Sequence, residues 1–244
     1  MRKNPTTRHA GPACLLLLAP AAAPAAETPM EELLVVDQRD ARTYELADTL
    51  DVVPDSAALL DRAVGADVVT NGPLTGMAQN RGMSRMRLSS RINGQVISPG
   101  GPNWMDAPLS YAPAAHLESL EVTRGIAPVS AGVETIGGVI DATSWHGRFT
   151  ESGRELQGRL RAGGHSVNDA SLVSASLVGA GPGQRVQLAV IDERGDDARF
   201  PGGRILPTEY ERRRYDVGYG FRVGDHTVQI DYGRNETGDA GTPA

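Results

Sequence analysis

The sequence predicts a small α+β unit followed by the first strands of an antiparallel transmembrane β-barrel, which this chain leaves incomplete. Three observations carry this prediction. Residues 44–145 alternate quickly between short helical and short extended patterns, as in a compact α+β unit. From Glu155 onward, apolar and polar residues alternate strictly, as in strands with lipid on one face and water on the other. The turns between those strands are alternately short and long.

Residues 1–26 have the composition of a secretory signal peptide. Basic residues at positions 2, 3 and 8 precede an apolar run over 13–19, and Ala23-Pro24-Ala25 provides small residues for cleavage. The apolar run is much shorter than the roughly 20 residues of a membrane-spanning helix. Cys14, the only cysteine, lies inside this segment. The mature chain is therefore expected to have no disulfide and no thiol chemistry.

The charge balance and the absence of catalytic motifs narrow the function. The chain has 24 basic and 30 acidic residues, a formal charge of −6, which argues against nucleic acid as a partner. The sequence has no Gly-x-Ser-x-Gly, phosphate-loop or His-Glu-x-x-His motif, and its five histidines are scattered. We therefore expect a protein that is not an enzyme and that needs no cofactor.

Residues 27–43 form a short acidic tail with one apolar tetrad. The tetrad consists of Leu33, Leu34, Val35 and Val36. An extended apolar segment in such a tail can add itself as a strand to the edge of a partner's sheet. A first strand of the α+β unit, or a plain linker, is the alternative interpretation of these residues.

Local signals predict the elements of the α+β unit. Asp55 is expected to cap a helix whose apolar residues follow at helical spacing. Asn93-Gly94, between apolar flanks, predicts a β-hairpin. Residues 113–120 are predicted to form a second short helix, with a strand at 121–123.

Five later segments are predicted to be barrel strands, because one face of each is apolar and the other polar or glycine-bearing. The apolar face is expected at Leu156, Gly158, Leu160, Ala162, Val173, Ala175, Leu177, Val186, Leu188, Val190, Tyr215, Val217, Tyr219, Phe221, Val223, Val228, Ile230 and Tyr232. A soluble β-sandwich would show a similar alternation.

Turn lengths separate these two architectures. Turns at 180–183 and 224–225 are short, whereas the connections at 163–168 and 195–207 are longer. Outer-membrane barrels have short periplasmic turns and longer outer loops. The alternation therefore favours a barrel whose first strand begins at the periplasmic side.

Several ordered motifs in the first half of the chain carry a resemblance. They are QNRGM at 79–83, RING at 91–94, NWMDAPLSY at 103–111 and VTRGIAPVSAGVETIGGVI at 122–140. Together they resemble the plug domain of TonB-dependent outer-membrane receptors. The structural motif consists of Arg81, Gly82, Arg124, Gly125, Gly137 and Gly138. Glycines permit the tight turns and close backbone approaches that a globule inside a barrel requires.

The resemblance implies a chain of four parts. These are a signal peptide at 1–26, a tail with the TonB box at 27–43, a plug domain at 44–145 and N-terminal barrel strands at 146–244. The TonB box falls on the apolar tetrad at 33–36, and Arg124 is expected to bridge the plug to the barrel wall. Plugged outer-membrane transporters use 22 strands, so five strands indicate a fragment of a longer receptor.

Methionines gather in the predicted ligand region. Thioethers are soft ligands that select Cu(I), although methionine is also an adaptable packing residue. The motifs at 80–83 and 103–108 resemble those of a copper-receptor subgroup, in which a cysteine and a histidine stand where this chain has Gly101 and Trp104. The predicted ligand-binding residues are Asn103, Trp104, Met105 and Asp106. The predicted metal ligands are Met77, Met83, Met86, Met105 and Asp106, with His116 as a further candidate.

The expected function is energy-coupled uptake of a metal or metal chelate through the outer membrane of a Gram-negative bacterium. The resemblance implies three partners: the TonB energy-transducing complex, outer-membrane lipid and a small-molecule or metal ligand. A siderophore or another small nutrient stays open beside copper as the cargo. Two alternatives also stay open, namely a plug-type binding or signalling module and a non-functional truncated receptor.

Overall fold

A computed structural model of the protein describes residues 43–45, 53–101, 104, 106–126, 129 and 135–242. The predicted signal peptide at 1–26, the TonB box at 33–36, Asn103 and Met105 lie outside these residues. We call the described residues between 43 and 144 the globular segment. The five long strands after residue 154 are called the long sheet.

Eight short strands lie in the described part of the globular segment. They are β1 (Thr43–Glu45), β2 (Ala66–Thr70), β3 (Gly76–Asn80), β4 (Met83–Ser84), β5 (Ser89–Ile92), β6 (Gln95–Val96), β7 (Leu117–Arg124) and β8 (Gly138–Ser144). Five of them form a sheet in the order β1-β7-β8-β5-β6, and β2-β3-β4 form a second sheet. Strands β5 and β8 run parallel, whereas the other pairs are antiparallel.

The helices of the globular segment are short and of the 3-10 type throughout the described residues. They are η1 (Ser56–Arg62), η2 (Arg85–Arg87), η4 (Pro108–Tyr111) and η5 (Ala114–His116). The predicted α+β class is therefore only partly confirmed, because no described segment is an α-helix. Runs of three to seven residues are too short for an α-helix to repay its nucleation.

The predicted cap of the first helix is confirmed. Oδ1 of Asp55 accepts a hydrogen bond of 2.9 Å from the backbone N–H of Ala57, and Oδ2 accepts one of 2.6 Å from Gly76. The second bond joins the start of η1 to the start of β3. Burial raises the pKa of the Asp55 carboxyl, against the lowering effect of both backbone bonds and of Arg212.

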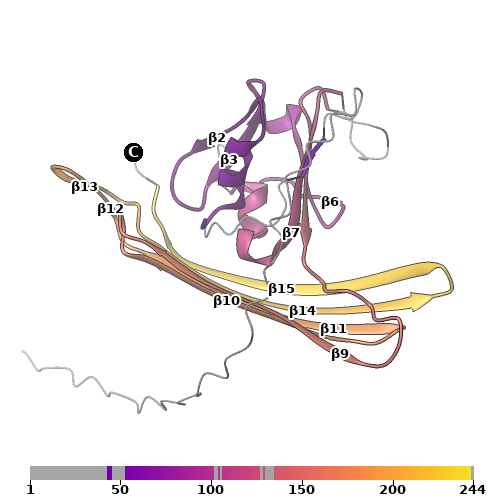
Figure 1. The fold of residues 1–244 in the computed structure, drawn as a ribbon. Coiled ribbons are helices and arrows are strands. Elements are labelled where there is room, and N and C mark those ends of the chain that lie inside the picture. Colours follow the sequence, from indigo (N-terminus) through magenta and orange to yellow (C-terminus); the bar gives the residue numbers. More distant parts are fainter. Residues whose placement is uncertain are drawn as a thin grey trace, which may run out of the picture. The chain divides into compact units, whose positions relative to one another are not determined.

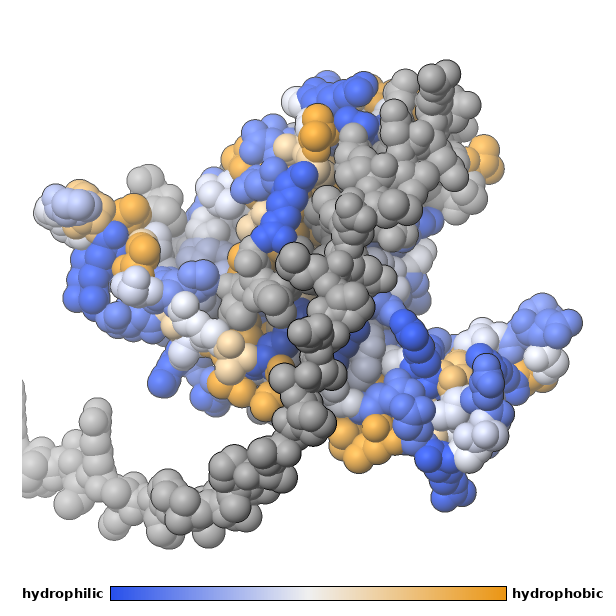
Figure 2. Space-filling view, in the orientation of Figure 1, coloured by the Kyte–Doolittle hydropathy of each residue, from blue (hydrophilic) through white to orange (hydrophobic). Residues whose placement is uncertain are grey.

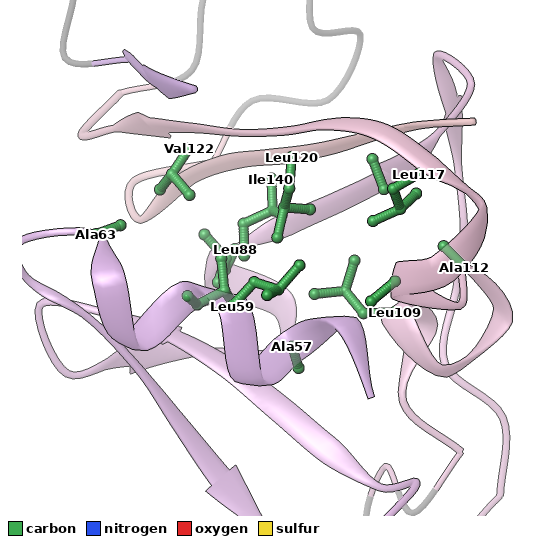
Figure 3. Close-up of a cluster of buried hydrophobic side chains, with 13 residues drawn as sticks. Ala57, Leu59, Ala63, Leu88, Leu109, Ala112, Leu117, Leu120, Val122 and Ile140 are labelled. Carbon is green, nitrogen blue, oxygen red and sulfur yellow. The ribbon is translucent and has the colours of Figure 1, made fainter. Parts of the chain in front are cut away.

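A single apolar core lies between η1 and the five-stranded sheet. Figure 3 shows Leu59, Leu88, Leu109, Leu120 and Ile140 converging from different elements. All of them are buried. The core is completed by Ala57, Leu60, Ala63, Ala112, Ala114, Leu117, Val122 and Ala142.

The helix predicted at 113–120 is wrong over most of its length. Only η5 is helical, and Leu117 begins β7. The reason is a two-residue period: Leu120 and Val122 are buried on one face of β7, and the strand pairs with β8 along its length. The hairpin predicted at Asn93-Gly94 is confirmed, with both residues at positive φ between β5 and β6.

Five long antiparallel strands follow and lie side by side in the order β15-β14-β11-β10-β9 (Figure 1). Their bounds are β9 (Glu155–His165), β10 (Ala170–Ala180), β11 (Gln184–Gly195), β14 (Tyr210–Val223) and β15 (His226–Ala240). A hairpin of β12 (Ala198–Phe200) and β13 (Gly203–Ile205) lies in the connection from β11 to β14. The sheet is open, because β9 and β15 are not paired with each other.

The predicted alternation of faces is confirmed in the long sheet. Leu160, Leu177 and Leu188 are exposed, while Ser174 and Gln187 are buried. Figure 2 shows apolar residues at the surface of this sheet among hydrophilic ones. No helix in the described residues is long and apolar enough to cross a lipid bilayer.

The turns of the long sheet agree with the predicted alternation only in part. Three residues link β10 to β11 and two link β14 to β15, whereas residues 196–209 link β11 to β14. The connection from β9 to β10 is only four residues long, since β9 extends to His165. Within this long connection, Asp197 is buried and accepts a 2.8 Å hydrogen bond from the backbone N–H of Thr208.

Candidate ligand site

A cavity of about 200 Å³ lies in the globular segment between β3, η2 and β5. Residues 96–99, Trp104 and Pro108 close it on the side of the predicted ligand loop. The predicted ligand-binding residues lie at 103–106, and three further predicted metal ligands, Met77, Met83 and Met86, lie at 77–86. The structure brings parts of both segments to this one cavity.

Two of the predicted thioether ligands line the cavity. Met77 reaches it from β3 and Met86 from η2, where Met86 is 82% exposed. Met83, in β4, is not among the lining residues. The cavity thus has two thioethers available in the described residues, and Met105 lies outside them.

Trp104 lines the same cavity and has a left-handed backbone, with a φ of 64°. A bulky residue in this region is strained and is held there by its surroundings. Its half-buried indole is a large, flat surface over which a cation or an apolar ligand can lie.

The polar groups of the cavity are few. Among the described residues that line it, Arg85 is the charged one. The hydroxyl of Ser89 is buried, with 6% of the residue exposed, and Oγ finds no hydrogen-bond partner in the described part of the chain. A buried hydroxyl of this kind can bind a polar atom of a ligand.

Asp106, predicted as a metal ligand, makes a different contact. Its backbone forms two 3.3 Å hydrogen bonds with Gly100, which close the loop between them. Its carboxylate accepts a hydrogen bond from the hydroxyl of Tyr111. That bond, followed by burial, raises the pKa of Tyr111 to about 12. Asp106 is not among the residues that line the cavity.

In the described residues, no group of three or more His, Cys, Asp and Glu side chains is placed to hold a metal ion. His116, the further candidate ligand, does not line the thioether cavity.

The structural motif residues form turns and close contacts in the globular segment. Arg81 and Gly82, both at positive φ, make the two-residue turn from β3 to β4. A side chain at Gly138 would bring a Cβ within 1.9 Å of the carbonyl oxygen of Thr123. Both backbone groups of Gly137 form hydrogen bonds. Its N–H donates to the carbonyl oxygen of Arg87 at 2.8 Å, and its carbonyl oxygen accepts from Nδ2 of Asn80 at 2.6 Å.

Arg124 is the last residue of β7. The guanidinium of Arg124 donates a 3.0 Å hydrogen bond to the carbonyl of Val64, which lies in the globular segment. Gly125 follows at a φ of 88°, where glycine is favoured. The predicted bridge from Arg124 to the barrel wall stays a prediction.

The globular segment is held on the long sheet mainly by arginines. Their guanidinium groups donate to backbone carbonyls of residues 110–117, which we call the strap. The bonds are Arg212 to Ser110 (3.0 Å), Arg214 to Tyr111 (2.9 Å), Arg161 to Ala114 (3.2 Å) and Arg159 to Leu117 (3.4 Å). Small apolar contacts, such as Ala115 with Leu172 and Ile191, add to them.

A second cavity of about 200 Å³ lies between the strap and the long sheet. Two histidine–aspartate pairs line it: His116 Nδ1 with Asp216 Oδ2, and His146 Nε2 with Asp231 Oδ2, each at 3.0 Å. Arg214 lines it as well. This cavity is polar, in contrast to the thioether cavity.

The arginines that hold the start of the strap, Arg212 and Arg214, were not among the predicted functional residues. They lie on the face of β14 opposite the predicted apolar residues Tyr215 and Val217. Charged residues at alternate positions near a strand end were the available signal. Their carbonyl partners in the strap have no side-chain signature at all.

The described fold is a small globular segment with glycine-bearing turns, docked on five long antiparallel strands. No protein-family model and no curated protein matches this sequence. Among solved structures, the copper transporter OprC is similar, with a TM-score of 0.72 and 23% identity over 82% of this chain and 31% of that chain.

Two further solved structures share the fold. A double mutant of the Serratia marcescens hemophore receptor HasR, in complex with its hemophore HasA and heme, has a TM-score of 0.70 and 19% identity, covering 81% of this chain and 32% of that one. The FrpB iron transporter from Neisseria meningitidis has a TM-score of 0.65 and 16% identity, with coverage of 81% and 32%. The chain thus spans about a third of the length of these structures. The resemblance to TonB-dependent receptors is confirmed for the fold.

Proposed function

We propose that this chain is the N-terminal part of a TonB-dependent outer-membrane receptor for energy-coupled uptake of a metal ion or metal chelate. The plug-on-wall fold and the similarity to OprC, FrpB and HasR support the class. The observation that carries the metal proposal is the cavity where Met77, Met86 and Trp104 meet.

Copper is the proposed ion because of the chemistry of that cavity. Thioether sulfur selects soft Cu(I) over hard cations, and the indole face attracts a cation. The described lining residues include no carboxylate and no imidazole, which hard or borderline ions would require. Met105, the neighbour of Trp104 in the sequence, is the proposed third sulfur ligand.

The partners follow from the same proposal. The TonB complex would bind the apolar tetrad at 33–36, and lipid would cover the exposed apolar face of the long sheet. The proposed parts remain the signal peptide at 1–26, the tail at 27–43, the plug at 44–145 and the wall strands at 146–244. The proposed location is the outer membrane of a Gram-negative bacterium.

An anionic metal chelate is a second candidate cargo, favoured by one observation. Arg85 lines the cavity, and its positive charge would repel a bare cation and attract the carboxylates or phenolates of a chelator. The apolar lining suits an organic ligand of this kind.

Fluorescence titration of the refolded full chain tests the copper proposal. Trp104 lies in the cavity, while Trp145, the other tryptophan, is buried and only 8% exposed. Cu(I) added under reducing conditions should quench the emission saturably, and Met77→Leu or Met86→Leu should weaken this effect. Met83→Leu is the matched control, because Met83 does not line the cavity.

Ferric citrate serves as the anionic-chelate probe in the same assay. Arg85→Ala should weaken binding of the chelate and leave Cu(I) binding unchanged or stronger. A parent chain that shows no saturable change with Cu(I) would remove copper from the proposal. Equal effects of Met77→Leu and Met83→Leu would remove the thioether site.

A further inference from the structure

Residues 145–150, which we call the crossbar, follow β8 of the globular segment and precede the long sheet. They contact side chains from each of the five long strands. These side chains are Gln157 and Arg159 of β9, Val178 of β10, Arg185 and Gln187 of β11, Arg222 of β14 and Asp231 of β15. The crossbar is therefore attached to the whole width of the long sheet.

Polar side chains of the long sheet pair with the backbone of the crossbar. The side-chain amide of Gln157 accepts a 2.8 Å hydrogen bond from the N–H of Arg148 and donates one of 3.0 Å to its carbonyl oxygen. A single amide thus pairs with Arg148 much as a residue of a neighbouring strand would. Nη1 of Arg185 donates a 2.7 Å bond to the carbonyl oxygen of Gly147. Backbone groups taken from water need such partners, and the long sheet provides them.

The crossbar also packs closely against the sheet. Gly147 has a φ of 67°, in the left-handed region, and a Cβ on it would lie 2.9 Å from Cγ1 of Val178. Only a residue without a side chain permits this approach at low cost. The ring of Phe149 lies 4.6 Å from the guanidinium carbon of Arg185 and 4.3 Å from that of Arg222. Both arginines make cation–π contacts with this one ring.

The attachment of the crossbar to the globular segment lies at its first residue. The N–H of Trp145 donates a 2.9 Å hydrogen bond to the carbonyl oxygen of His116, directly after β8 ends at Ser144. At the next residue the partner is already the long sheet, since Nε2 of His146 lies 3.0 Å from Oδ2 of Asp231. The change of partner places a boundary at residues 145–146.

We infer that the crossbar is an anchor that belongs to the long sheet. The globular segment moves or unfolds as a unit that ends at β8, while residues 147–150 stay in place, and the pivot lies at Trp145 and His146. In the proposed uptake, a pull on the tail would open the globular segment and leave the crossbar with the long sheet. That use rests on the proposed function, whereas the anchor itself does not.

Native-state hydrogen exchange of the refolded full chain, read by mass spectrometry, tests the anchor. Leu120 is 1% exposed in the core of the globular segment, so Leu120→Ala destabilises that segment selectively. Exchange in β7 and β8 should rise by about tenfold or more, whereas the amides of Arg148 and Thr150 should exchange as in the parent. Amides of one cooperative unit respond together, so the crossbar would follow β8 only if it belonged to the globular segment.

Two variants of the anchor should give the opposite pattern. Gln157→Ala removes both bonds to Arg148, and the N–H of Arg148 should exchange about two- to tenfold faster, with β7 and β8 unchanged. Gly147→Ala reaches the same result by a different route, because its Cβ presses on Val178. Gln184→Ala, at an exposed glutamine of β11, is the matched control and should exchange like the parent.

Three results would overturn the anchor. In the first, Leu120→Ala speeds exchange at Arg148 and Thr150 as much as in β7 and β8. In the second, Gln157→Ala exchanges like Gln184→Ala. In the third, Gln157→Ala speeds β7 and β8 as much as the crossbar. No metal, chelate or TonB enters these measurements, so the anchor and the proposed receptor function can fail independently of each other.

Discussion

Arg212 of β14 and Glu193 of β11 form an ion pair in which each side chain is only 1% exposed. Arg212 also donates to the carbonyls of Pro54 and Ser110, so one buried side chain connects two wall strands with two parts of the globular segment. A buried charge is tolerated only when paired.

Loss of Arg212 should therefore destabilise the fold strongly. Arg212→Met keeps most of the volume but leaves Glu193 as an uncompensated buried anion, which costs about 3–5 kcal/mol. Urea unfolding of the refolded chain measures this change, and Arg212→Met with Glu193→Leu should recover a large part of it. Arg213→Met, which breaks the exposed pairs with Asp192 and Glu211, is the control; a loss no greater than in this control would contradict the prediction.

Gly76 should not accept a side chain. A Cβ there would lie 2.5 Å from Oδ2 of Asp55 and 2.8 Å from the Cβ of Ala57, so the helix cap would have to move. Gly76→Ala is expected to lower the free energy of unfolding by about 1–3 kcal/mol. Gly179→Ala, where nothing lies within 4 Å, is the comparison, and equal stability of the two variants would disprove the overpacking.

The turns predict an orientation in the membrane. In the Cys14→Ser background, single cysteines at Arg204 and Gly183 place thiols on the β12–β13 hairpin and on the short β10–β11 turn, both exposed. An impermeant thiol reagent on intact cells should label the first and not the second. The opposite result would reverse the proposed topology.

Alkaline pH should remove the contribution that the phenol of Tyr111 makes to the free energy of unfolding. The folded-state pKa of Tyr111 is about 12, raised from 10.0 by its bond to Asp106. The neutral phenol is therefore favoured on folding, and this stabilisation is present below pH 10 and is lost as the pH rises toward 12. The difference in unfolding free energy between parent and Tyr111→Phe should shrink over that range; a constant difference would argue against the bond.

Binding of TonB should depend on backbone donors in the apolar tetrad. Val35→Pro removes an N–H that an added strand would use and should abolish binding of the full chain to the purified periplasmic domain of TonB. Asp40→Pro, in the same tail, should leave binding intact. Parent-like binding by Val35→Pro would place the TonB box elsewhere.

The sequence predicts repeating structure here better than it predicts single contacts. The exposed and buried faces of β10 and β11 could be predicted from the order of apolar and polar residues alone. Both faces agree with the prediction. The helix predicted at 113–120 was wrong over most of its length. A proline followed by closely spaced apolar residues is compatible with the start of a helix and also with the start of a strand. Tertiary pairing with β8 decided in favour of the strand.

The ligand site was predictable as a region but not as a set of contacts. Met77, Met86 and Trp104 were expected together and line one cavity. Met83 and Asp106 were expected with them and do not line it. Which of several neighbouring side chains reaches a cavity depends on strand register and on partners such as Tyr111, and these are long-range properties.

The bonds between the wall arginines and the strap have a consequence for sequence variation. Every residue has a carbonyl oxygen, so Ser110, Tyr111, Ala114 and Leu117 offer the same acceptor whatever side chains they carry. Side-chain substitutions at these positions leave the hydrogen bonds to the arginines possible, provided the backbone keeps its conformation. Plugs of unrelated sequence could then be exchanged onto one wall, and the arginines would be the part of such chimaeras that has to be retained.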